Sequence, residues 1–158
     1  VVRAVIRELP RLGYSADQIQ GITPMHRGPL GVTQLNHRLQ ETLNPPAARK
    51  PQLKVGDEVF RPGDRVLQVV NNYDKAVYNG EIGRITRVHL DTKQVVVAFD
   101  DLHVPYEFSE LDQLQLAYAM TIHKSQGSEY PVAVIVMHSS HFIMLSRNLL
   151  YTVALLIG

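Results

Sequence analysis

Residues 132–137 have the sequence Val-Ala-Val-Ile-Val-Met, an uninterrupted apolar run in which four of the six positions are β-branched. Such a run is typical of a strand buried on both faces, as in the centre of a parallel sheet. A second short strand is predicted at residues 19–23, where Pro24 ends it. A helix is then predicted from apolar residues at helical spacing: Val32, Leu35, Leu39 and Leu43. Strand, polar loop and helix in this order predict an α/β domain with loop residues 25–29 at the carboxyl end of a strand.

The ends of the chain carry further elements of the same type. Helices are predicted at residues 1–12 and 146–152, and a helix or tight turn is predicted at residues 121–127. Strands are predicted at residues 114–119 and 153–157.

The middle of the chain has a different character, because it opens with Pro45, Pro46 and Pro51 and then alternates short β-like runs with turns. The runs are residues 58–60, 65–70, 82–90, 94–99 and 104–108. Five short strands in some 60 residues predict a small β-barrel of SH3-like size. We therefore expect an α/β domain built from residues 1–50 and 112–158, with residues 51–111 inserted as a barrel.

Composition narrows the function classes. The chain has 158 residues, of which 45% are hydrophobic and 20% charged, so we expect a folded domain rather than disorder. Lys and Arg number 16 against 15 acidic residues, so net charge favours no class of partner. The absence of Cys excludes a thiol nucleophile and fits a cytoplasmic location. No apolar run reaches the roughly 18 residues of a membrane helix, and without an initiator Met we expect the chain to begin inside a longer protein.

Residues 119–130, Ala-Met-Thr-Ile-His-Lys-Ser-Gln-Gly-Ser-Glu-Tyr, concentrate polar side chains directly before the apolar run. Hydroxyl and imidazole groups donate well to phosphate oxygens, whereas the Glu129 carboxylate suits a ribose hydroxyl. Gly127 lets a backbone approach a ligand closely. By composition alone, the segment could equally be a polar loop with a capping serine.

The order of these residues resembles motif V of superfamily 1 helicases, most closely the RecD-like branch. Residues 22–32, followed by Leu35-Asn36, resemble the motif IV region of that branch. Residues 63–66, 71–75 and 79–83 resemble its inserted SH3-like subdomain, and residues 147–152 resemble the start of motif VI. The resemblance spans nearly the whole chain.

The resemblance implies the RecA-like, P-loop NTPase-type second motor domain (2A) of an ATP-dependent 5′-to-3′ DNA helicase, with an SH3-like 2B insert. It implies that Arg27 reaches the γ-phosphate of ATP and that Gln126, Gly127 and Glu129 face the nucleotide. By the same resemblance, Thr121, His123 and Ser125 bind phosphates of single-stranded DNA.

Two features depart from the family pattern. The chain has no Gly-x-x-x-x-Gly-Lys-Ser/Thr loop, so we expect no ATP hydrolysis by the chain alone. Mg²⁺ would be held mainly by an N-terminal motor domain of the same polypeptide. The motif VI arginine is also missing, because Thr152 runs directly into residues 153–158. A deletion or a missing loop would explain this, and the strand-like character of residues 153–157 favours the missing loop.

The insert offers further candidates for DNA binding. Lys75, Arg84 and Arg87 could meet phosphates, and Tyr73 and Tyr78 could stack on bases. The alternative is that these are solvated cations and barrel tyrosines. A zinc site at His138 and His141 is not expected without a carboxylate or Cys at a suitable spacing, and no hydrolase motif is present.

Two further alternatives stay open. The intact protein could act alone or within a recombination nuclease complex. The chain could also be a non-catalytic module that binds nucleic acid or protein through the barrel.

Overall fold

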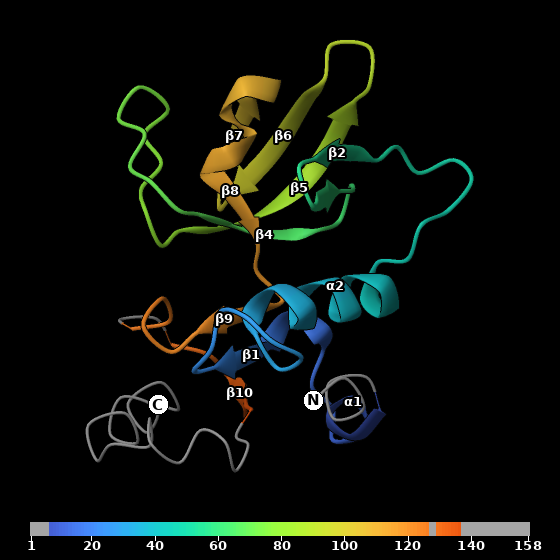
Figure 1. Cartoon of the computed structure of the whole chain (residues 1–158), viewed down its shortest axis with the longest axis vertical. Coiled ribbons are helices and arrows are strands. Elements are labelled where there is room, and N and C mark those ends of the chain that lie inside the picture. Colours follow the sequence, from blue (N-terminus) through green and yellow to red (C-terminus); the bar gives the residue numbers. More distant parts are fainter. Residues whose placement is uncertain (1–6, 127–128, 137–158) are drawn as a thin grey trace. The chain divides into compact units, whose positions relative to one another are not determined.

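The computed structural model describes residues 7–126 and 129–136. The chain forms two compact units, one from residues 1–43 and 118–158 and the other from residues 44–117 (Figure 1). These boundaries differ from the expected ones at 50/51 and 111/112 by several residues. Each unit has its own sheet, and the units are described separately below.

The first unit is built on a three-stranded parallel sheet in the order β10-β1-β9. Its strands are β1 (Ile19–Thr23), β9 (Ala119–Thr121) and β10 (Val132–Ile135). The two strands predicted at residues 19–23 and within residues 132–137 are therefore confirmed. The central strand is buried along its whole length. At its middle, Gly21 lies so near β9 that a Cβ atom there would be 3.1 Å from the carbonyl oxygen of Tyr118.

Helix α2 (Val32–Leu43) has the predicted bounds. It buries Leu35 and Leu39 together with two polar residues, Asn36 and Gln40. The apolar spacing therefore identified the buried face of the helix, although that face is half polar.

The helix predicted at the amino terminus is confirmed over its described residues, but its apolar face is not buried. Residues 7–11 are helical and include the α-helix α1 (Leu9–Arg11), the chain turns at residues 12–13, and the 3-10 helix η2 (Ala16–Gln18) follows. Leu12, expected on the apolar face, is 73% exposed. Residues 122–126 form a turn, as one of the two predicted alternatives required. The elements predicted at residues 146–152 and 153–157 lie outside the described residues.

The second unit contains a five-stranded antiparallel sheet in the order β7-β6-β5-β4-β8 and a two-stranded sheet of β2 and β3. The strands are β2 (Leu53–Val55), β3 (Glu58–Phe60), β4 (Arg65–Gln68), β5 (Ile82–His89), β6 (Gln94–Phe99), β7 (Leu102–Tyr106) and β8 (Leu114–Leu116). Each of the five predicted strands has a counterpart, although β4 ends at Gln68 and β7 is shifted to residues 102–106; β2 was not predicted, and closure into a barrel stays a prediction. The 3-10 helix η3 (Phe108–Gln113) connects β7 to β8.

Strand β8 corrects the expected boundary. Residues 114–119 were assigned to one strand of the α/β part, but Leu114–Leu116 pair antiparallel with β4 in the second unit. Ala119–Thr121 form the separate strand β9 of the first unit. Both segments are short and apolar, so hydrophobic periodicity could not show that they are two strands. Their different pairing partners show it. Within the described residues, no helix has the length and apolar character needed to cross a membrane.

Candidate functional site

The parallel register of the first unit brings two polar loops to one edge of its sheet, the edge formed by the carboxyl ends of β1 and β9. Thr23, the last residue of β1, lies opposite Thr121, the last residue of β9. The loop that follows β1 and the turn that follows β9 therefore leave the sheet at the same edge. A backbone hydrogen bond joins them, since the amide of Ile122 donates to the carbonyl of Thr23 at 3.2 Å.

The loop after β1 carries Arg27 and is closed by its own hydrogen bonds. The Thr23 hydroxyl donates to the carbonyl of Leu30 at 2.8 Å, and the amide of Val32 donates to the carbonyl of Met25 at 2.9 Å. Arg27 is exposed at the outside of this loop.

Gly31 is required for the close packing of the same loop. A Cβ atom at this position would be 2.6 Å from the carbonyl carbon and oxygen of Arg27 and from the carbonyl oxygen of His26. Since these are backbone atoms, a side chain at position 31 would displace the backbone of Arg27.

The turn after β9 separates the predicted DNA ligands into two groups. Thr121 and Ser125 are buried: the Ser125 hydroxyl donates to the carbonyl of Ile122 at 2.9 Å, and the Thr121 hydroxyl accepts from the amide of Lys124 at 3.3 Å. These two hydroxyls hold the turn together. His123 and Gln126 are exposed on it and are free of that constraint.

The structure does not bring the other residues predicted to face the nucleotide next to Arg27. Gly127 lies outside the described residues. Glu129 is exposed, but strand register does not bring it to the edge with Arg27. Strand β10, which follows it, begins opposite Ile19, at the other edge of the sheet.

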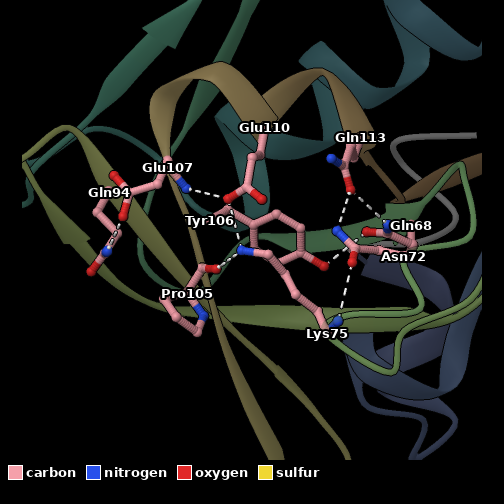
Figure 2. Close-up of polar contacts among 9 residues, drawn as sticks. All are labelled: Gln68, Asn72, Lys75, Gln94, Pro105, Tyr106, Glu107, Glu110 and Gln113. Carbon is pink, nitrogen blue, oxygen red and sulfur yellow. Dashed lines mark hydrogen bonds and ion pairs between the residues drawn. The ribbon is translucent and has the colours of Figure 1, made fainter.

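In the second unit, Lys75 is held among protein groups. Its ammonium forms an ion pair with Glu110 at 2.7 Å and donates to the carbonyl of Pro105 (Figure 2). The same ammonium lies 5.0 Å from the centroid of the Tyr106 ring. Only 21% of the Lys75 side chain is exposed. These contacts give Lys75 a structural role that the sequence did not reveal, and they do not favour the predicted phosphate contact.

A hydrogen-bond network extends from this ion pair through the unit. The Tyr106 hydroxyl donates to Gln68 at 2.8 Å, and the amides of Gln68 and Asn72 both donate to the side-chain oxygen of Gln113 (Figure 2). Asn72 also accepts from the amide of Lys75. The polar loop of residues 71–80 is thereby attached to β4, β7 and η3.

Two pKa shifts follow from these contacts. Burial raises the pKa of Tyr106, and the nearby carboxylates of Glu110 and Glu81 raise it further. Burial opposes ionisation of Glu110, but the hydrogen bond from Lys75, the amide of Glu107 and the Lys75 charge together lower its pKa below the ordinary value. Glu110 is therefore ionised near neutral pH.

The other insert candidates are exposed. Tyr73 is 75% exposed and forms an edge-to-face pair with Tyr78, with ring centroids 6.0 Å apart. Arg84 is exposed on β5 and donates to the carbonyl of Gly63 at 2.9 Å. An aromatic pair of this kind offers a surface on which a base can stack.

Two buried polar residues were not assigned a role from the sequence. Asn36 of α2 donates to the carbonyl of Ala119 at 2.9 Å and accepts from the amide of the same residue at 2.7 Å. Asp64 is fully buried and accepts from the amide of Arg61 and the side chain of Asn44, both at 2.7 Å. An asparagine between two leucines on the apolar face of α2 was the available signal for the first; no comparable pattern marked the second.

Metal binding has no support in the described part of the chain, where no group of three or more His, Cys, Asp or Glu side chains could hold a metal ion. His138 and His141 lie outside the described residues.

Comparison with known proteins identifies the family. The family model described as the ATP-dependent RecD-like DNA helicase SH3 domain matches residues 35–99, and that of the UvrD-like helicase C-terminal domain matches residues 116–154. The ATP-dependent RecD2 DNA helicase of Deinococcus radiodurans is 38% identical over 151 residues, which cover 96% of this chain and 20% of that protein. The chain belongs to the RecD-like DNA helicases.

Other relatives support the same family. The RecBCD enzyme subunit RecD of Mycobacterium tuberculosis is 33% identical over 129 residues, covering 80% of this RecD-like chain and 21% of that protein. The chain thus spans about a fifth of the length of these curated relatives.

Solved structures confirm the fold class. A Bacteroides Pif1 helicase in complex with ADP-AlF3 and single-stranded DNA matches with a TM-score of 0.62 and 21% identity, covering 96% of this chain and 41% of that one. A structure of two coordinating Pif1 helicases at forked duplex DNA matches with a TM-score of 0.61 and 23% identity, covering 97% and 42%. The predicted RecA-like motor domain with an SH3-like insert is therefore confirmed as the fold of this RecD-like chain.

Proposed function

We propose that this chain forms one side of the ATP site and part of the single-stranded DNA track of an ATP-dependent DNA helicase that moves 5′ to 3′. The observation that carries the proposal is the register of Thr23 against Thr121, which places the exposed Arg27 loop and the exposed His123 turn at one sheet edge. The family membership supplies the kind of reaction, and the edge supplies residues suited to it.

On the nucleotide side, Arg27 is the residue suited to the γ-phosphate. A guanidinium held on a closed loop stabilises the charge that spreads over the phosphoryl oxygens during transfer. Gln126 is exposed on the turn and offers an amide to the nucleotide, whereas the nucleotide contacts of Gly127 and Glu129 stay predictions of the sequence.

On the DNA side, His123 is the principal candidate because its side chain is exposed on the turn. Ser125 would donate to a phosphate only by giving up its hydrogen bond to Ile122, and Thr121 is buried while it accepts from Lys124, so both act mainly by shaping the turn. In the insert, Tyr73 and Arg84 remain proposed contacts for the strand, and Lys75 acts by holding the loop that carries Tyr73.

Mg²⁺ would be held elsewhere. The described residues contain no carboxylate cluster that fits it, so this chain's part in the reaction is derived from Arg27 and the turn alone. We propose that a motor domain preceding this segment in the same polypeptide supplies the metal ligands and the loop that cradles the phosphates. The RecD relatives are named as subunits of the RecBCD enzyme. Action within a recombination nuclease complex and a cytoplasmic location are further parts of the proposal.

The test uses the full-length helicase that contains this segment, with Arg27→Ala, His123→Ala and Glu129→Ala. We expect His123→Ala to weaken binding of single-stranded DNA more than binding of ATP, and Glu129→Ala to do the reverse. Arg27→Ala should lower the DNA-stimulated rate of ATP hydrolysis while ATP still binds. Unwinding of duplexes with 5′ or 3′ tails gives the direction. If Arg27→Ala and His123→Ala both bind and hydrolyse as wild type does, the assignment of this edge is wrong. Normal ATP binding by Glu129→Ala would refute only the predicted nucleotide contact of Glu129.

The exposed Tyr73–Tyr78 pair supports a second candidate, a non-catalytic module that binds nucleic acid or protein through the insert. In that case Tyr73→Ala would abolish binding, while the Arg27 and Glu129 variants would behave as wild type.

A further inference from the structure

Asn36 is a buried polar residue that the proposed function does not yet use. It is 2% exposed on the apolar face of α2, between Leu35 and Leu39. Burying an amide side chain is unfavourable unless its donor and acceptor are both satisfied. The backbone of Ala119 satisfies both, at 2.9 Å and 2.7 Å.

These two bonds satisfy the backbone amide and carbonyl of Ala119 on the side of β9 that faces away from β1. Among the described strands, β9 lies at the edge of the sheet and pairs with β1 through neighbouring groups such as the carbonyl of Tyr118. The amide and carbonyl of Ala119 face away from β1, because the backbone groups of successive strand residues point to opposite sides. The Asn36 side chain thus takes the place of a peptide group in an adjacent strand.

The position of Asn36 links the two loops of the proposed site. Helix α2 begins at Val32, directly after the loop that carries Arg27, and Gly31 is packed against the backbone of Arg27. Ala119 begins β9, which ends two residues later at Thr121 and continues into the turn that carries His123. The Asn36 side chain therefore connects α2, which follows the Arg27 loop, to β9, which precedes the His123 turn.

We propose that Asn36 is a positioning residue that holds the His123 turn in place relative to the Arg27 loop, so that DNA binding by the turn depends on it. The inference rests on the proposed function of this edge. Without the two hydrogen bonds, the edge of β9 loses its anchor to α2, and the turn after Thr121 samples positions in which His123 no longer meets the DNA phosphate.

The test is a double-mutant cycle of Asn36→Ala and His123→Ala in the full-length helicase, read as the Kd for single-stranded DNA at fixed salt. We expect Asn36→Ala to weaken binding about tenfold, because it removes the two hydrogen bonds that position the turn. In the His123→Ala background, the same substitution should have little further effect. Asn36→Ser, whose hydroxyl can still donate or accept one hydrogen bond, should weaken binding about threefold and provides a second variant if Asn36→Ala does not fold.

Leu39→Ala is the matched control. Leu39 is 1% exposed and lies about one turn further along α2, so its truncation destabilises the unit while leaving the Asn36 bonds in place. We expect its effect on DNA binding to be small and the same in both His123 backgrounds.

The outcomes separate this inference from the proposed function. If Asn36→Ala, or Asn36→Ser where Asn36→Ala does not fold, binds DNA as wild type does, or if its effect is equally large without the His123 side chain, Asn36 is structural only and the inference is overturned. If His123→Ala itself binds DNA normally, the functional assignment of the turn fails and the positioning role fails with it.

Discussion

Substituting Lys75 by Met decides between two roles for this residue. The sequence predicted a phosphate contact, whereas the structure gives Lys75 an ion pair with Glu110, a hydrogen bond to Pro105 and a cation–π contact with Tyr106. A partly exposed ion pair contributes about 0.5–1 kcal/mol, and the hydrogen bond and ring contact each add a similar amount. Because such terms are not additive, we expect Lys75→Met to lower the free energy of unfolding by about 1.5 kcal/mol.

The matched control is Lys93→Met. Lys93 also lies over an aromatic ring, 5.4 Å from the centroid of Phe108, but both residues are exposed. Its removal should cost no more than about 0.5 kcal/mol. Urea unfolding of the 158-residue chain, followed by circular dichroism, compares the two variants with wild type.

The effect of Lys75→Met should also depend on pH. Because the pKa of Glu110 is lowered in the folded chain, its contribution to stability is fully present above the ordinary glutamate pKa of 4.5. The contribution is lost as the pH falls through the lower folded value. The difference between wild type and Lys75→Met should therefore shrink when unfolding is measured well below pH 4.5 rather than at pH 7.

The stability and DNA-binding measurements together can refute this reasoning. If Lys75→Met unfolds like Lys93→Met but binds single-stranded DNA more weakly than wild type, the contacts with Glu110 and Tyr106 are unimportant and the phosphate role is correct. We expect the opposite pattern.

Two further predictions concern close packing and buried charge. Gly31→Ala should lower the DNA-stimulated ATPase rate of the full-length helicase severalfold with little change in DNA affinity, because the added Cβ atom would lie 2.6 Å from backbone atoms of Arg27 and displace them. Gly56→Ala meets no atom near its Cβ position but is strained by a φ of +59°, so it controls for a general loss of stability on replacing a glycine. An unchanged rate for Gly31→Ala would contradict the packing argument. Asp64→Ala should lower the free energy of unfolding by about 3 kcal/mol, because the Arg61 amide and the Asn44 side chain would lose a buried acceptor. Urea unfolding checks this, and a loss below about 1 kcal/mol would mean that water replaces the carboxylate.

Much of the local structure could be predicted from residue order. The run at residues 132–137 and the spacing of apolar residues in 32–43 gave the correct strand and helix, and the turn residues between β-like runs located five strands of the insert. Local periodicity is sufficient where one face of an element is buried, because that face repeats within the element. In the described part of residues 1–12 the same signal predicted the helix but not a buried face, because Leu12 is exposed.

The order of motifs predicted the family and the fold class, and the strand ends predicted which loops carry polar residues. Which of those residues face solvent depended on the packing of distant segments. Thr121, His123 and Ser125 alternate in one motif, yet only His123 is exposed, because the two hydroxyls close the turn on its own backbone. The partners of Lys75 are 30 and 35 residues away along the chain, and those of Asn36 are 83 residues away. Contacts of this range arise only when the strands pair, so neither composition nor spacing could have shown that a lysine in a polar loop binds a glutamate or that an asparagine completes the edge of a sheet.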